Sequence, residues 1–467
     1  MSPDFSPAEF GAAFQKFMEF VNAQAPPAQP GPPLVDKIIA FLGADPASLV
    51  ILKETFLERD LPNLQLAFDY FLTGPERSAE LLGYIADHES PDFGLTAILS
   101  RHRWQLVAEG PVRYSSVELA DGQRLQCVQK GLYLVHDHGS RVVVLIHGND
   151  QYWGVQGVTL ELLCPEAERA EAVLAEIRRL VHQHNVYRGH VISLGAKGAE
   201  DVRFHSLPSI AREAIILPAH LLEIIERNTL DFAKHAPRLR AAGRHIKRGL
   251  LFHGPPGTGK TLTLMYLASQ MPGRTVILLT GRVQGLILQS CRLARLLAPS
   301  MVVLEDVDLI AEEREREGER GPLLFELLNE MDGLAADSDV LFILSTNRPD
   351  LLEPALAARP GRIDQAIEFP LPDADCRSRL FALYGQGLDL RVDDLDDMVR
   401  RTEGVSPAFI RELLRKAALL AAEQRQDSLE PPVVTDGHLR EALRSIVTEG
   451  GELTKRLLGV APGALEG

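Results

Sequence analysis

The stretch that decides the fold is "RGLLFHGPPGTGKTLTLMYLASQ", residues 248–270. An apolar, strand-like run leads into the glycine-rich GPPGTGKT at 254–261, and a helix-favouring run follows it. The middle part fits the pattern G-x-x-x-x-G-K-[ST], in which glycines let backbone N–H groups approach phosphate oxygens at the start of a helix. A chance glycine-rich loop is the alternative, but the strand before the loop and the helix after it favour a phosphate-binding loop.

The loop and the residue after it supply the expected nucleotide contacts. They are Gly254, Pro255, Pro256, Gly257, Thr258, Gly259, Lys260, Thr261 and Leu262. In this pattern the lysine reaches the β- and γ-phosphates and the following hydroxyl ligates Mg²⁺, which assigns those roles to Lys260 and Thr261. ATP and Mg²⁺ are therefore the expected cofactors.

Two adjacent acids follow the apolar run at 302–304, in the order Glu305 then Asp306. Most such sites read Asp then Glu. We assign Glu305 to the metal and Asp306 to the attacking water, although a register in which Asp306 holds the metal also fits. Glu exceeds Asp by one methylene, about 1.5 Å of reach, and an uncompensated shift of that size costs about a hundredfold in rate. Asp308 is expected only to cap the next turn.

Five motifs in order make residues 213–447 resemble an AAA family ATPase of the AAA+ superfamily. They are GPPGTGKT, VVLEDVD, LLNEMDG at 327–333, ILSTNRPD with Asn347, and LEPALAARPGRID with Arg359 and Arg362. The resemblance implies a P-loop NTPase fold, α/β with a parallel sheet and a helical lid, assembled as a homo-oligomeric ring, expected to be a hexamer. It also implies that Asn347 helps to place the attacking water and that Arg359 and Arg362 serve the site of the next protomer.

The chain also departs from the family pattern. The Glu-Asp order is similar to that of the mitochondrial complex-III assembly AAA ATPases, which hydrolyse ATP, so the resemblance favours a working site. The first pore loop region, "GRVQGLILQSCR" at 281–292, has no aromatic residue, and aromatics are the large, rigid surfaces that grip polypeptide. The charged stretch at 311–320 stands where a second pore loop begins; a solvated loop is favoured over a ring of charge.

Three further expectations concern the lid helix, the wall of the adenine site and the C-terminal tail. "GVSPAFIRELLRKA" at 404–417 resembles the lid helix of the family, where Arg411 could reach a phosphate, although an exposed helical arginine is the favoured interpretation. "AIILPAHLLEII" at 214–225 is the expected apolar wall for adenine. The glycine-rich tail is expected to be frayed.

The expected domains are a helical N-terminal segment at 1–102 with a Pro-rich linker at 25–33, a mixed α/β module at 103–200, an AAA large ATPase domain at 213–373 and a helical lid at 374–456. The run "VYRGHVISLG" at 186–195 is expected to end the mixed module. His136 and His138 form an H-x-H pattern, but no cysteine or carboxylate completes a zinc set. The module is expected to recognise a client, which the sequence does not identify.

Composition narrows the function classes. The 467 residues are 45% apolar and carry a net charge of −15, which argues against a dedicated duplex-DNA binder; nucleic acid is not an expected partner. Four cysteines without CxxC spacing favour a reduced, cytoplasmic compartment. No apolar run approaches the roughly 18–20 residues that a membrane span requires, and the N-terminus does not resemble a signal peptide.

Three functions remain. The preferred one is a cytoplasmic, ring-forming Mg-ATP hydrolase that remodels or translocates a protein client through its N-terminal module. The alternative is a nucleotide-gated assembly scaffold that hydrolyses ATP slowly, which the inverted acids and the missing pore aromatic favour. A nucleic-acid motor comes third, and salt-dependent binding to single strands would support it.

Overall fold

The computed structural model describes residue 16 and residues 34–45, 49–86, 93–99, 107–150, 155–195, 198–279, 286–308, 338–352, 363–424, 431–448, 458–461 and 464. The chain divides into two compact units. The first comprises Met1–Val117 and Gln126–Gln183, and the second comprises Glu118–Leu125 and His184–Gly467. Among the described helices, none has the length and hydropathy that a membrane crossing requires.

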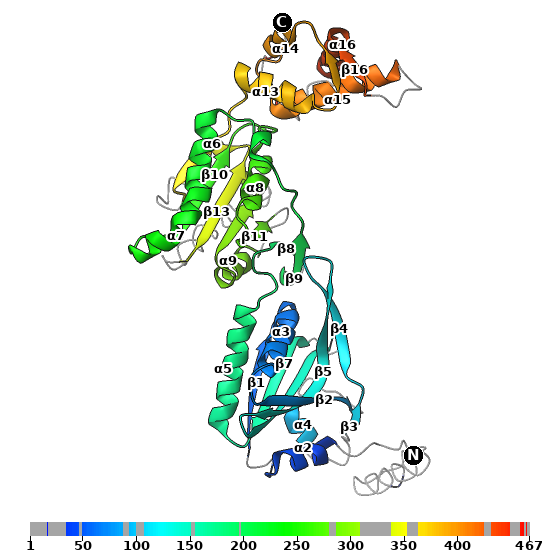
Figure 1. Ribbon diagram of the computed structural model, residues 1–467, viewed down its shortest axis with the longest axis vertical. Helices are drawn as coiled ribbons and strands as arrows, with labels where there is room; N and C mark the ends of the chain where they lie inside the picture. Colours follow the sequence, from blue (N-terminus) through cyan, green and yellow to red (C-terminus); the bar gives the residue numbers. More distant parts are fainter. Residues whose placement is uncertain are drawn as a thin grey trace, which may run out of the picture. The chain divides into compact units, whose positions relative to one another are not determined.

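The first unit is built on a mainly antiparallel sheet in the order β1-β7-β6-β5-β2-β3, with β4 paired to β5. Its strands are β1 (Val50–Phe56), β2 (Arg77–Ala86), β3 (Val107–Gly110), β4 (Arg113–Glu118), β5 (Arg124–Asp137), β6 (Ser140–Asp150) and β7 (Val155–Cys164). Its helices are α2 (Leu34–Leu42), α3 (Leu61–Leu72), α4 (Leu95–Leu99) and α5 (Ala167–Gln183) (Figure 1).

Helices cover both faces of this sheet. Leu132 and Leu134 of β5 lie in one core with α2 and α4. Tyr133, between them in sequence, contacts Phe68 of α3 with ring centroids 4.6 Å apart. Because successive side chains of a strand point to opposite faces, α3 lies on the other face, where it packs against α5.

The segment 1–102 was expected to be helical, and this is wrong for residues 50–56 and 77–86, which form the strands β1 and β2. The helices expected from "VDKIIAFL" and "LQLAFDYFL" are present as α2 and α3, but β1 and β2 lie between and after them. β1 pairs with β7 along its whole length, from Val50 opposite Cys164 to Phe56 opposite Val158. The periodicity of a short apolar run does not distinguish a strand from a helix. Here the pairing with β7, which is distant in the sequence, makes residues 50–56 a strand. The Pro-rich linker at 25–33 lies outside the described residues.

The second unit contains a seven-stranded sheet in the order β14-β10-β13-β12-β11-β8-β9. Its strands are β8 (Val191–Gly195), β9 (Gly198–His205), β10 (Arg248–His253), β11 (Thr275–Leu279), β12 (Ser300–Leu304), β13 (Val340–Thr346) and β14 (Gln365–Glu368). The neighbouring pairs from β14 to β8 are all parallel. The parallel sheet of the expected α/β fold is therefore confirmed.

The hairpin of β8 and β9 corrects the sequence analysis. "VYRGHVISLG" was expected to end the mixed module, but β8 pairs in parallel with β11, and β9 pairs antiparallel with β8. The two strands extend the second sheet at its edge. Sequence alone does not show which of two sheets a strand joins, because the pairing spans more than 80 residues, as between Ile192 and Ile277.

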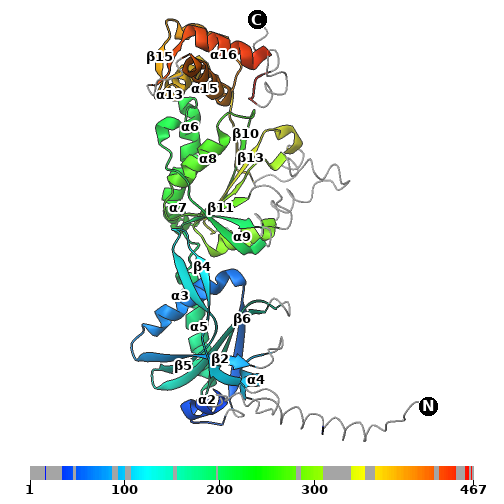
Figure 2. The same cartoon turned by 90° about the vertical axis from the view of Figure 1, so that its right-hand side faces the viewer.

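Helices cover both faces of the parallel sheet (Figure 2). On one face, α6 (Ala219–Glu226) and α8 (Lys260–Ser269) pack against alternate strand residues such as Leu250 and Met301. On the other, α9 (Leu286–Leu296) packs against residues such as Leu251. The helix α7 (Phe232–Ala241) follows α6 in the chain. This layering leaves the carboxyl ends of the strands free to carry polar loops.

The last part of the chain forms a separate apolar core. It contains α13 (Ala374–Tyr384), α14 (Leu395–Arg401), α15 (Pro407–Glu423) and α16 (Asp436–Thr448). The expected helical lid is thus observed, with one addition. The short strands β15 (Asp389–Arg391) and β16 (Val433–Thr435) pair in parallel beside the helices.

Candidate active site

The predicted phosphate-binding loop joins the end of β10 to the start of α8. Its first glycine, Gly254, has φ +143°, and a Cβ there would lie 2.3 Å from the carbonyl oxygen of Phe369. Only glycine fits this close approach of two backbones. Within the loop, Thr258 Oγ1 donates to the Pro255 carbonyl at 2.9 Å. This hydrogen bond and the close backbone contact at Gly254 hold the loop in its folded shape.

Lys260 lies at the centre of the site and is only 7% exposed. Its Nζ donates to the carbonyls of Gly254 at 2.8 Å and Pro255 at 2.9 Å, and to Oδ1 of Asn347 at 2.9 Å. Burial lowers the pKa of Lys260 to about 8, against the opposing attraction of Asp306 and Asp308. A buried ammonium at the start of a helix is a strong site for an anion.

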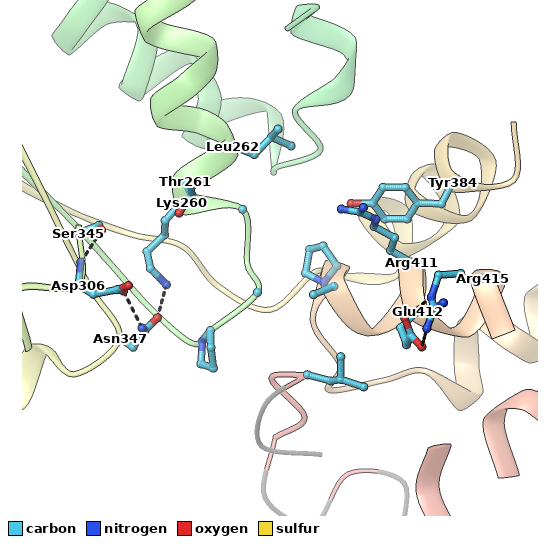
Figure 3. Close-up of a pocket in the computed structure, with 16 residues that line it drawn as sticks. Lys260, Thr261, Leu262, Asp306, Ser345, Asn347, Tyr384, Arg411, Glu412 and Arg415 are labelled. Carbon is cyan, nitrogen blue, oxygen red and sulfur yellow. Dashed lines mark hydrogen bonds and ion pairs between the residues drawn. The ribbon is translucent and has the colours of Figure 1, made fainter. Parts of the chain in front are cut away.

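Asp306 directs its carboxylate toward the same place. Its Oδ1 accepts a hydrogen bond from Asn347 Nδ2 at 3.1 Å, and its backbone N–H donates to Ser345 Oγ at 3.3 Å (Figure 3). Asp306 has φ +50°, a left-handed conformation that costs energy for a residue with a side chain. The backbone after β12 therefore bends in a way that presents the second acid to Asn347 and Lys260.

Glu305 lies differently from Asp306. It is half-buried and does not line the cavity that contains Lys260 and Asp306. One of its carboxylate oxygens, Oε1, is buried and makes no hydrogen bond to any described residue. A buried carboxylate oxygen without a donor fits a site that a hydrated cation completes. Of the two residues expected to hold Mg²⁺, Thr261 lines this cavity and Glu305 does not.

Asp308 has a larger role than sequence reasoning assigned to it. The side chain is 5% exposed, and its Oδ1 accepts from Thr346 Oγ1 at 2.8 Å and from the backbone N–H of Asn347 at 3.2 Å. It does not simply cap the turn after β12. It connects that turn to the end of β13 and thereby fixes Asn347. The parallel pairing of β12 with β13 is the reason, because it brings both carboxyl ends to one edge.

These residues open into a cavity of about 530 Å³, within the range of small-molecule sites. From the large domain it is lined by Pro256, Gly257, Gly259, Lys260, Thr261, Leu262, Asp306, Ser345 and Asn347. From the helical lid it is lined by Tyr384, Pro407, Ala408, Arg411, Glu412, Arg415 and Leu458. The large-domain part of this lining is centred on Lys260, whereas the lid contributes the apolar Pro407, Ala408 and Leu458 together with the charged Arg411, Glu412 and Arg415.

Comparison with known proteins matches this part of the chain to a family. Residues 250–371 match the model of the "ATPase family associated with various cellular activities (AAA)". The chain therefore carries an AAA domain. The matched residues include the phosphate loop, both acids and Asn347.

Curated relatives share this domain. The chain is 34% identical over 248 residues to "ATP-dependent zinc metalloprotease FtsH 3" of Symbiobacterium thermophilum. The aligned region covers 49% of this chain and 38% of the relative. The chain is 31% identical over 333 residues to "Cell division cycle protein 48 homolog" of Archaeoglobus fulgidus, covering 63% of this chain and 45% of that one. The chain thus spans less than half the length of these relatives. The crystal structure of the FIGL-1 AAA domain in complex with ADP is similar at 22% identity, with a TM-score of 0.42, over 54% of this chain and 93% of that one.

Arg411 of the lid is exposed, as expected, but it also lines the cavity of the AAA domain. It lies beside Tyr384 (Figure 3), whose pKa is raised by burial and moderated by this guanidinium. Arg415, one turn further on, forms two hydrogen bonds with Glu412, at 2.8 and 2.7 Å. Of the two arginines, Arg411 is therefore the better placed to contact an anion.

Other expectations have different outcomes. No residue of 214–225 is among those that line the cavity; instead Leu221, Leu222 and Ile225 are buried in the core beside the sheet. Arg359 and Arg362, and the stretches at 311–320 and 327–333, lie outside the described residues.

Among the described residues, the one group of three potential metal ligands is Asp373, Asp375 and Cys376 of the second unit. It includes neither His136 nor His138 of the first unit. His136 instead packs edge-on against Phe41.

Proposed function

We propose that this protein is a Mg-ATP-hydrolysing AAA ATPase that assembles into a homo-oligomeric ring, a hexamer, and remodels a protein client recognised by its N-terminal unit. The observation that supports catalysis is the continuous contact from Lys260 through Asn347 to Asp306. Asn347 is hydrogen-bonded both to Lys260, the cation that would bind phosphate, and to Asp306, the acid that would orient the attacking water.

The residues take separate roles in this proposal. Lys260 binds the β- and γ-phosphates, and Asp306 with Asn347 orients water toward the γ-phosphate. Thr261 and Glu305 would hold Mg²⁺, which neutralises phosphate charge when bound. Arg359 and Arg362 act on the site of the neighbouring protomer. There a guanidinium stabilises charge that develops on the transferred phosphoryl group, worth roughly 10³–10⁵ in rate in other nucleotidases.

A protein client is proposed because the named relatives are an ATP-dependent metalloprotease and a Cdc48 homolog. We take only the ATP-dependent part of the first description, because the match covers 38% of that relative and the family model matches the ATPase domain of this chain. We place the protein in the cytoplasm. All four cysteines, Cys127, Cys164, Cys291 and Cys376, are free and buried, as expected of a reducing compartment.

A slow, nucleotide-gated scaffold is the second candidate. The inverted order of Glu305 and Asp306 favours it, because an acid misplaced by about one methylene lowers the hydrolysis rate without removing nucleotide binding. The two candidates differ in turnover and not in nucleotide affinity.

Mixed assemblies test the ring. Lys260→Ala removes nucleotide binding but keeps the arginines, whereas Arg362→Ala keeps the binding site but removes an arginine. Each variant alone is expected to hydrolyse little ATP. Mixing them should restore activity, because Arg362→Ala sites then receive an intact Arg362 from Lys260→Ala neighbours. If mixing restores nothing although light scattering shows co-assembly, Arg362 does not act between protomers. The client is sought by capture on an Asp306→Asn ring.

A further inference from the structure

A segment far along the chain lies against the turn that starts α15. Ser406 Oγ donates to the carbonyl of Leu458 at 2.5 Å, and the backbone N–H of Ala461 donates to the carbonyl of Gly404 at 2.8 Å. Leu458 and Val460 both pack against the lid core. We call residues 458–461 the strap. The expectation of a frayed tail is wrong for these residues.

The strap also reaches the phosphate-binding loop. Gly459 is buried and has φ +65°, and a Cβ on it would lie 2.2 Å from the carbonyl oxygen of Pro256 and 3.0 Å from Ser406 Cβ. Any other residue would push the strap away from the loop, because both the backbone angle and the space require glycine. The strap, the loop and the start of α15 therefore meet at one point.

Leu458 lines the cavity at this point, together with Pro407 and Ala408. These three side chains form an apolar part of the lid lining, beside the charged Arg411, Glu412 and Arg415, whereas Lys260 and Asp306 lie in the large-domain lining of the same cavity. In a site that binds the phosphates of a nucleotide at Lys260, the apolar part of the lining faces the nucleoside. Val460 belongs to the same strap and the same lid core but does not line the cavity.

We propose that the strap closes the nucleotide site and that Leu458 is a specificity-determining residue that contacts the nucleoside. This inference rests on the proposed function, since it presumes that the cavity binds ATP and ADP. It adds a part of the chain that none of the five sequence motifs contains.

The test is isothermal titration calorimetry of the full-length protein with ADP and Mg²⁺, and separately with inorganic triphosphate. Leu458→Ala should raise the Kd for ADP about five- to tenfold, as expected for a partly buried leucine contact, and leave the Kd for triphosphate unchanged. Val460→Ala is the matched control. It removes apolar contacts from the same lid core and should leave both Kd values unchanged.

A second pair of variants tests the strap without altering Leu458. Gly459→Ala should weaken ADP binding, because it forces the strap away from Pro256. Gly387→Ala is the control, since Gly387 has a similar φ of +83° but no heavy atom within 4 Å of an added Cβ. It carries comparable backbone strain in the lid without disturbing the loop.

Three results would overturn the inference. If Leu458→Ala and Gly459→Ala bind ADP like the wild type, while Lys260→Ala does not bind it, the strap fails and the proposed function stands. If Leu458→Ala weakens ADP and triphosphate equally, the residue supports the loop and does not contact the nucleoside. If the wild type binds neither probe, the proposed function is wrong and the strap has no nucleotide to cover.

Discussion

Asn347 Nδ2 donates a hydrogen bond of 3.1 Å to Oδ1 of Asp306. The amide at the end of β13 thus meets the second acid after β12, although that acid has a shorter side chain than the glutamate common at such positions. The left-handed backbone of Asp306 supplies a compensating change of direction. The inverted order of the acids is therefore compatible with a working arrangement, and Asn347 is the residue that shows it.

Replacing Asn347 by Ala should lower kcat about 10- to 100-fold and change KM by less than about threefold. The amide is proposed to position water, which matters mainly in the transition state. Steady-state kinetics at saturating and limiting ATP separate the two parameters. A large rise in KM at constant kcat would assign Asn347 to ground-state binding instead.

Asp308 should be required for stability and for the position of Asn347. Asp308→Ala leaves the Thr346 hydroxyl and the Asn347 N–H without their acceptor, which should lower the free energy of unfolding by about 2–3 kcal/mol. Asp308→Asn keeps an acceptor oxygen and should recover part of the loss. Asp350→Ala, which removes an exposed partner of Arg348, is the control and should leave urea unfolding unchanged. Equal stability of all variants would contradict the role given to Asp308.

Nucleotide affinity should fall as the pH rises above about 8. Burial lowers the pKa of Lys260 to about 8, so the side chain is charged below that pH and loses its proton above it. Phosphate favours the charged form, so binding above pH 8 should also take up a proton. Calorimetry in buffers of different ionisation enthalpy measures this uptake. Lys260→Arg should remove both effects, because guanidinium stays protonated; a flat profile from pH 7 to 9.5 in the wild type would rule the explanation out.

A buried ionic cluster should stabilise the first unit. Arg77 donates to Asp137, which is 0% exposed, at 2.7 Å and to Glu176 at 2.7 and 3.0 Å. Arg77→Leu should cost about 3 kcal/mol, since it removes one partner of a buried charge. Lys37→Leu, which breaks an exposed pair with Glu80, should cost less than about 1 kcal/mol.

The same cluster should make the stability of the first unit depend on pH in the acidic range. The hydrogen bond from Arg77 holds the pKa of Glu176 below its usual value of 4.5. A lowered carboxyl pKa contributes stability that is complete above the unfolded value and is lost as the pH falls through the folded one. Thermal unfolding between pH 6 and 3 should therefore show a steeper loss in the wild type than in Arg77→Leu. Parallel curves would show that the pair contributes nothing.

The parallel sheet and the phosphate loop could be predicted from the sequence because both are local signals. Strands buried on both faces are continuous apolar runs, and the loop has fixed spacing. The strand β1 was missed because its partner β7 is more than 100 residues away. The strand β8 was assigned to the wrong module for the same reason, since only its pairing with β11 shows which sheet it joins.

In the candidate site, too, the residues in local sequence motifs could be predicted and those placed by long-range contacts could not. Lys260, Asp306 and Asn347 were found from motifs, and the structure brings them into direct contact. Asp308 and Leu458 were not assigned to the site, because their positions depend on hydrogen bonds to residues that are distant in the sequence. Asp308 accepts a hydrogen bond from Thr346 at the end of β13, and the carbonyl of Leu458 accepts one from Ser406 just before α15. No local sequence pattern predicts either contact.

The most direct test is steady-state ATP hydrolysis by the wild type and by Asp306→Asn over a range of protein concentrations, with ADP binding measured in parallel. Our account predicts turnover that rises with concentration in the wild type, and a loss of about a hundredfold or more in Asp306→Asn with ADP affinity retained. Equal, slow hydrolysis by both proteins, with normal ADP binding, would contradict it and would favour the nucleotide-gated scaffold.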